Sequence, residues 1–232
     1  MKQHTTQPQH TGRMVFPDYD VEDVVPFLNW DALLDRFQAA DRQALREAFD
    51  QQIQALVQQH GLTLQALIGI YELHATEDKI QITDRPKHQV LLANQGIPTS
   101  EKWIGCYALS AGIGLEQLLE KTEDETQKEQ LIALTDALSE GFKQVVLSFL
   151  RRQMWGYERP EDFSTEKILR NEYRGTDLPI DSPEQQTQLY ELMGVGRTTA
   201  ITLNNKHLEP HSSRIGLFTA CDVFGSNKAT TK

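Results

Sequence analysis

The chain has 232 residues, of which 39% are hydrophobic and 24% charged, a composition typical of a globular protein with a substantial core. Its formal net charge of −10 and its scattered Lys and Arg residues argue against a nucleic-acid partner, because nucleic-acid phosphates bind clustered cations. No apolar run approaches the ~20 residues of a membrane span, and residues 1–13 lack the apolar segment of a secretory signal. We therefore expect a cytoplasmic protein without membrane spans.

The two cysteines, Cys106 and Cys221, provide no disulfide framework and no CxxC zinc motif. Cys106 lies in the apolar run at 103–109, which predicts a buried structural thiol. The polar composition of the two ends predicts a disordered segment at 1–15 and a flexible tail at 226–232. Residues 16–225 are expected to form one domain.

Two helices are predicted in the first quarter of the chain. The apolar residues that follow Asn29 recur at three-to-four spacing, with Asp31 as the expected N-cap of this helix. A second helix is predicted at 41–60, and Gly61 has the residue type that commonly ends a helix.

The middle of the chain changes to strand patterns. Apolar or alternating residues at 67–73 and 79–83 predict a hairpin, and 90–93 indicates a further strand or a short helix. A buried central strand is predicted at 103–109. The Gly-Ile-Gly sequence at 112–114 then leads into a helix at 115–121. It resembles a phosphate-binding turn, but Gln117 stands where GxGxxG has its third glycine, so a tight turn is favoured.

The strongest helical pattern covers residues 127–154, where one face stays apolar. A short helix capped at Ser164 is predicted to end near Asn171, and another helix is predicted at 183–193. Two further strands are expected. The elements together predict an α+β fold, with a mostly antiparallel twisted sheet packed by long helices. The two late strands span residues 198–203 and 215–220.

Spacing alone predicts no catalytic or metal site. His207 and His211 are separated by Pro210, which breaks a helix, so the two imidazoles need not share a face. The acidic run at 123–125 is more typical of a solvated surface than of a metal site. Ser212 lies outside any nucleophile-elbow context.

The segment after the long helix carries the most specific pattern. It contains Trp-Gly-Tyr at 155–157, Ser-Thr-Glu at 164–166 and Glu-Tyr-Arg-Gly at 172–175. This order resembles the S-adenosylmethionine-binding activation domain that ends cobalamin-dependent methionine synthases. Further matching segments extend the resemblance from about Val25 to Phe224; they lie at 25–30, 107–112, 182–184, 191–193, 202–203 and 210–216.

The resemblance implies the fold of that family and a ligand groove built from seven positions. These are Asn29, Trp30, Tyr157, Asn171, Tyr173, Arg174 and Asp177. In the family, acidic residues occupy the positions of Asn29 and Asn171. An Arg-Pro-x-Pro-Gly-Tyr-Pro loop grips the ligand, whereas this chain has the shorter segment 176–181 with Asp177. An arginine fork binds a carboxylate by two charge-assisted bonds, and Asp177 would repel the carboxylate.

Two functional hypotheses follow from the resemblance. The first is a stand-alone module that binds S-adenosylmethionine and acts in trans in the reductive reactivation of a cobalamin-dependent methionine synthase or a related corrinoid methyltransferase. Cobalamin would then be carried only by the partner protein. The alternative is a docking module that has lost S-adenosylmethionine and recognises a corrinoid protein or another small ligand. An independent enzyme on the same scaffold is a third idea, which no residue spacing supports.

Overall fold

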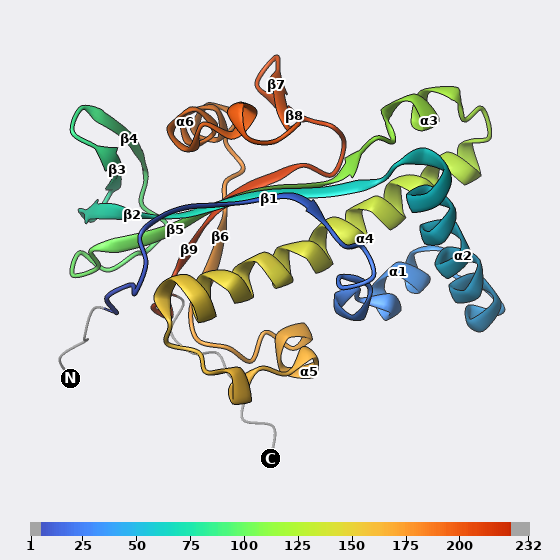
Figure 1. Cartoon of the computed structure of the whole chain (residues 1–232), viewed down its shortest axis with the longest axis horizontal. Helices are drawn as coiled ribbons and strands as arrows, with labels where there is room; N and C mark the ends of the chain where they lie inside the picture. Colours follow the sequence, from blue (N-terminus) through green and yellow to red (C-terminus); the bar gives the residue numbers. More distant parts are fainter. Residues whose placement is uncertain (1–5, 224–232) are drawn as a thin grey trace.

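The computed structural model describes residues 6–223, which form a seven-stranded antiparallel sheet with helices on both faces (Figure 1). The strand order is β4-β3-β2-β5-β9-β6. The strand β2 pairs with β5 along one side, and on its other side it pairs first with β1 and then with β3. The predicted α+β class is confirmed. The strands of this sheet are β1 (Gly12–Tyr19), β2 (Thr63–Ala75), β3 (Lys79–Arg85), β4 (His88–Ala93), β5 (Trp103–Ile113), β6 (Thr176–Pro179) and β9 (Arg214–Thr219).

The sheet separates two hydrophobic cores. The larger one lies between the sheet and α4, with α1 and α2 closing one end. The smaller one lies on the opposite face under α6, next to the hairpin of β7 (Thr202–Asn204) and β8 (His207–Glu209). The helices are α1 (Trp30–Arg36), α2 (Arg42–His60), α3 (Glu116–Lys121), α4 (Glu125–Phe149), α5 (Thr165–Leu169) and α6 (Pro183–Met193).

The long helix is confirmed, with one difference at its end. Asp124 caps α4 by accepting a bond from the Gln127 amide, and the predicted apolar face is buried. From Leu150 to Trp155 the chain widens into a π-helical turn, and Gly156 ends it with φ of 72°. The apolar pattern does not distinguish this turn from a continued α-helix, because Leu150, Met154 and Trp155 are buried like the apolar residues of α4.

Two strands lie where the sequence predicts none. Residues predicted to be disordered belong to β1, which starts at Gly12, and the segment predicted as a loop contains β6. Both lie at an edge, since within residues 6–223 β1 pairs only with β2, and β6 only with β9. Each contains a proline, Pro17 or Pro179, and a short or half-exposed apolar pattern, so neither shows the alternation of a strand with one buried face. The predicted tail at 226–232 lies outside the described residues.

The strand predicted at 198–203 is mostly wrong. Only Thr202–Asn204 is extended, because the chain before it forms a 3-10 turn at Val195–Arg197 and irregular turns. Those turns bury Val195 and Ile201 under α6, so their apolar character reflects loop packing and not a sheet.

Gly112 does not belong to a phosphate-binding loop. It lies within β5, and the turn itself falls at Gly114, which has φ of 91°. The carbonyl oxygen of His211 lies only 2.2 Å from the place where a Cβ on Gly112 would be. The glycine therefore permits close packing of β5 against the 210–213 loop, in agreement with the expectation of a structural role.

The predicted helices near the N-terminus are confirmed, but the cap of the first is not Asp31. Asn29 holds this position and accepts a bond from the amide of Ala32 at 3.1 Å.

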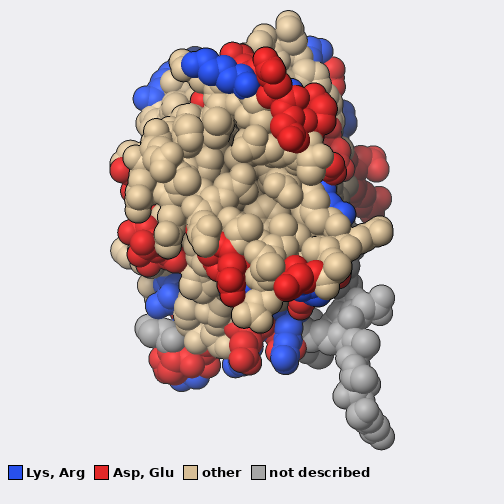
Figure 2. All heavy atoms as spheres, turned by 90° about the vertical axis from the view of Figure 1, so that its right-hand side faces the viewer, with Lys and Arg blue, Asp and Glu red and all other residues tan. Residues whose placement is uncertain are grey.

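Figure 2 shows the end of the molecule that carries α2 and α3, where few charged side chains lie at the centre of the face. From Gln51 to His60, α2 contains no Lys, Arg, Asp or Glu.

Candidate functional site

Asp177 joins three elements of the fold beneath α4. Its carboxylate accepts a hydrogen bond of 2.7 Å from the hydroxyl of Tyr107 on β5 and forms an ion pair of 2.9 Å with Lys143 of α4. Gly216 on β9 makes this geometry possible, because a Cβ there would lie 2.4 Å from the Tyr107 hydroxyl. The side chain predicted to repel a ligand carboxylate is thus already held by a cation and a donor.

The charges around Asp177 alternate in sign. Lys143 also contacts Glu140 at 2.7 Å, and Glu140 contacts Arg214 at 3.4 Å. Burial opposes the charge on Lys143, but the two carboxylates outweigh it and raise the pKa of Lys143. Burial and the neighbouring Asp177 raise the pKa of Tyr107, so its hydroxyl stays a donor. We call Tyr107, Glu140, Lys143, Asp177 and Arg214 the Asp177 cluster.

A cavity of about 280 Å³ opens beside the Asp177 cluster. Lys143 and Arg214 face it together with Asp181, so it presents charges of both signs. A lining of this kind suits a zwitterionic ligand, because each charged end of the ligand can pair with a side chain of opposite charge. The full lining is Tyr107, Lys143, Pro179, Ile180, Asp181, Gln186, His207, Leu208, Ser213, Arg214 and Ile215.

Four of the predicted ligand residues meet in a second cavity or beside it. The Tyr157 hydroxyl donates to the carbonyl of Arg174 at 2.9 Å, and the Arg174 guanidinium lies 5.1 Å from the centre of the Tyr157 ring. Tyr173 donates to Asn171 at 3.4 Å. The cavity measures about 290 Å³, and we call it the tyrosine pocket; it is lined by Tyr157, Glu158, Asp162, Lys167, Glu172, Tyr173 and Arg174.

Tyr173 connects the tyrosine pocket with the Asp177 cluster. Its hydroxyl reaches Gln144 of α4 at 3.3 Å. Burial raises the pKa of Tyr173, while Arg151 acts in the opposite direction and Asp177 adds to the rise. The two cavities therefore belong to one polar strip along the C-terminal half of α4.

Asn29 and Trp30 lie apart from this strip. Asn29 acts as a helix cap, and the Trp30 ring packs under the guanidinium of Arg46 at 4.3 Å. Within residues 6–223, neither side chain lines either cavity or bonds to the other predicted ligand residues. The structure thus groups five of the seven predicted positions, and a ligand role for any of them stays a prediction.

Sequence reasoning missed the cationic part of the strip. Lys143 interrupts the apolar face of α4 between Phe142 and Val145, and Glu140 precedes it by three residues. A lysine inside such a face needs a carboxylate partner, so this break in the pattern could have indicated a buried ion pair. Arg214 gives no comparable signal, since its partner is distant in sequence.

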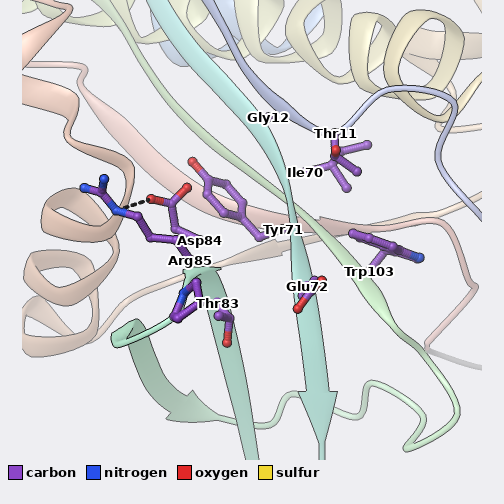
Figure 3. A pocket seen from close by; sticks show the side chains of 10 residues that line it. Thr11, Gly12, Ile70, Tyr71, Glu72, Thr83, Asp84, Arg85 and Trp103 are labelled. Carbon is purple, nitrogen blue, oxygen red and sulfur yellow. Dashed lines mark ion pairs between the residues drawn. The ribbon is translucent and has the colours of Figure 1, made fainter.

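A third cavity, of about 490 Å³, lies elsewhere, at the junction of β1 and β3 along β2 (Figure 3). Trp103 lies on one side of the β2 ribbon and Tyr71 and Asp84 lie on the other, with Arg85 paired to Asp84 at 3.7 Å. None of the predicted ligand residues lines it.

Comparison with known proteins gives the family. The family described as "Vitamin B12 dependent methionine synthase, activation domain" matches residues 92–223, more than half of the chain. The chain belongs to this family. The match covers α4, the Trp-Gly-Tyr segment and the whole Asp177 cluster.

A solved structure of similar fold supports the assignment. It is described as "Crystal Structure of the MetH Reactivation Domain bound to AdoHcy" and matches with a TM-score of 0.80 and 17% sequence identity. The match covers 93% of this activation-domain chain and 80% of the other chain. At this identity the likeness shows the fold, and the AdoHcy ligand is a property of that protein.

The described part of the activation-domain chain contains neither a metal-binding cluster nor a membrane-spanning helix. Among the described residues, no three His, Cys, Asp or Glu side chains gather in a way that could hold a metal ion. In the same part of the chain, no helix is long and apolar enough to cross a membrane. Cys106 is buried as expected, and burial raises the pKa of its thiol.

Proposed function

We propose that this activation domain serves the reductive reactivation of a cobalamin-dependent methyltransferase, acting in trans on a corrinoid protein. The observation that carries the proposal is the family match over residues 92–223, which includes the polar strip along α4. The domain's part is to present S-adenosylmethionine, which supplies the methyl group when bound. The cobalamin belongs to the partner.

The cavity beside the Asp177 cluster offers partners for the charged groups of S-adenosylmethionine. Lys143 and Arg214 would hold its carboxylate, and Asp181 would face its ammonium group. Lys143 is restrained by Glu140 and Asp177, so its attraction for a further carboxylate is weakened. We therefore expect S-adenosylmethionine to bind through shared charges and not through an arginine fork.

Calorimetric titration tests this ligand assignment. The wild-type domain is expected to release or absorb saturable heat with S-adenosylmethionine and with S-adenosylhomocysteine, and Lys143→Met is expected to weaken both at least about tenfold. Arg36→Met is the control, because Arg36 pairs with Glu129 on the surface and neither residue lines this cavity. An unchanged affinity in Lys143→Met would contradict the assignment.

A reconstituted reaction tests the role itself. The domain would be mixed with a corrinoid protein in the cob(II)alamin state, S-adenosylmethionine and an electron donor, and methylcobalamin would be followed by its absorbance. We expect methylation to depend on the domain. Methylation at the same rate without the domain would refute the role.

The Asp177 geometry also favours a second candidate, a docking module without S-adenosylmethionine. Asp177 is bound on both sides by Tyr107 and Lys143, which closes the position expected to clamp the ligand carboxylate. This candidate predicts a stable complex with a corrinoid protein in analytical ultracentrifugation and no heat with millimolar S-adenosylmethionine. A titration with clear saturation would exclude it.

A further inference from the structure

Arg151 is a buried cation at the end of the long helix. The π-turn of Leu150–Trp155 directs its side chain inward, where none of it is exposed. Its Nε donates to Glu158 at 2.8 Å, and its guanidinium carbon lies 3.9 Å from the centre of the Tyr173 ring.

The rest of this guanidinium is unsatisfied. Within residues 6–223, both terminal nitrogens of Arg151 are buried without a hydrogen-bond partner, and so is the indole nitrogen of Trp155. Buried donors in native proteins nearly always have an acceptor, because burying them without one costs about 1–3 kcal/mol each. An acceptor with more than one oxygen is the simplest group that would complete this arrangement.

The tyrosine pocket lies next to the Arg151 guanidinium and is the route by which such an acceptor would reach it. Glu158 and Tyr173 flank the guanidinium of Arg151 and also line the pocket. The Tyr173 hydroxyl is held only by two long bonds, 3.3 Å to Gln144 and 3.4 Å to Asn171, whereas hydroxyl bonds are commonly about 2.7–2.8 Å. These two long bonds are the hydroxyl contacts that would have to break for the Tyr173 ring to turn aside and open the guanidinium to the pocket.

We propose that Arg151, with Arg174 across the pocket, binds the oxyanion of a small monocarboxylate. The planar fork of Arg151 still has its terminal nitrogens free for a bidentate bond, and the Arg174 guanidinium lies over Tyr157 on the same pocket. This site is separate from the cavity beside the Asp177 cluster and does not depend on the proposed function.

The charges of the pocket favour a carboxylate over a phosphate. Glu158 already neutralises part of Arg151, and Asp162 and Glu172 add two further carboxylates to the lining, against the cations Lys167 and Arg174. A doubly charged phosphate would be repelled more strongly than a carboxylate with one charge. The tyrosine rings supply an apolar wall for a short carbon chain.

NMR titration with propionate tests the site directly. We expect saturable shifts of the Arg151 Nε–H signal and the Trp155 indole signal, with an apparent Kd of roughly 10 mM for so small a ligand. The neutral isostere propionamide is expected to cause no saturable shift, and inorganic phosphate at equal ionic strength is expected to bind at least about threefold more weakly. The indole signal of Trp30 provides an internal reference.

Variants assign the effect to the two arginines. Arg174→Gln is expected to weaken propionate binding about three- to tenfold, and Arg151→Lys at least about tenfold, because lysine lacks the planar fork. Arg46→Gln is the matched control, since Arg46 also stacks on an aromatic ring but far from the pocket. It should bind propionate as the wild type does.

Several outcomes would overturn the proposal. One is the absence of saturable shifts in the wild-type protein at 100 mM propionate, roughly ten times the expected Kd. Equal shifts with propionamide would show that charge is not recognised. If Arg151→Lys does not fold, Arg174→Gln decides, and its unchanged affinity would refute the site.

Discussion

The Asp177 cluster contacts α4 through Glu140 and Lys143, and Arg151 lies farther along the same chain segment in the π-helical turn, but the two sites differ in how fully their charges are satisfied. In the Asp177 cluster, each charged group has an opposite partner within 3.4 Å. At Arg151 one nitrogen has a partner and two have none. A satisfied network mainly fixes the protein's own structure, whereas an unsatisfied one retains binding capacity. The following substitutions separate these two roles.

Arg151→Gln should cause the largest change in stability. It leaves Glu158, whose side chain is only 12% exposed, without its cation, and it removes the support under the Tyr173 ring. We expect the free energy of unfolding to fall by about 4 kcal/mol, as for other broken buried pairs. Urea unfolding measures this change. The double variant Arg151→Met with Glu158→Gln should recover part of it, and no recovery would contradict the ion-pair explanation.

Gly216→Ala should cause the next largest loss of stability. The added methyl group would overlap the Tyr107 hydroxyl, which lies 2.4 Å from the ideal Cβ position, and would push the ring away from Asp177. We expect a loss of about 3 kcal/mol in the free energy of unfolding, the upper range for overpacking. Gly12→Ala is a useful comparison, because no atom lies within 4 Å of its Cβ position and only its φ of 99° opposes alanine. Gly216→Ala should destabilise more than Gly12→Ala, and the reverse order would show that backbone strain dominates.

Lys143→Met should have a moderate effect. It removes the cation that separates Glu140 from Asp177, so we expect the free energy of unfolding to fall by about 2 kcal/mol at neutral pH. Lys206→Met should leave the free energy of unfolding almost unchanged, since that pair is exposed. Equal losses in the two variants would mean that the Asp177 cluster behaves as an ordinary surface network.

Tyr107→Phe should have the smallest effect and a distinctive pH dependence. At pH 8 the lost hydrogen bond to Asp177 should cost about 1 kcal/mol. The pKa of Tyr107 is raised in the folded state by burial and Asp177, so its contribution is complete below the ordinary value of 10.0 and decreases above it, where the unfolded tyrosine ionises. Unfolding measurements between pH 8 and 11 should therefore show the difference between wild type and variant shrinking above pH 10. A constant difference would contradict a raised pKa.

The same comparison explains which features the sequence could predict. The helix α4 is predicted by its long apolar face and the central strand β5 by its continuous apolar run. Both elements bury apolar residues that are close together in sequence, so a local pattern reveals them. The strand β1 has no such pattern, because most of its residues are exposed and its partner β2 is far away in sequence. Its existence depends on tertiary pairing, which a local pattern does not contain.

The candidate site shows the same limit. The family resemblance identified Tyr157, Tyr173 and Asp177, which the structure places along one strip. It did not identify Arg151, whose inward direction depends on the π-turn. It also placed Asn29 among the ligand positions, although this residue caps α1. Side-chain direction at a helix end is set by backbone geometry that residue types alone do not specify.

The strands β1 and β3 pair with successive parts of the same side of β2, and this arrangement bears on association between molecules. Arg13 fastens the start of β1 by donating to Tyr71, Asp84 and the carbonyl of Leu192. Detaching β1 would leave the backbone of residues 64–70 open on that edge, as a template for an extended segment of a second molecule. The three bonds of the Arg13 guanidinium therefore oppose such detachment of β1.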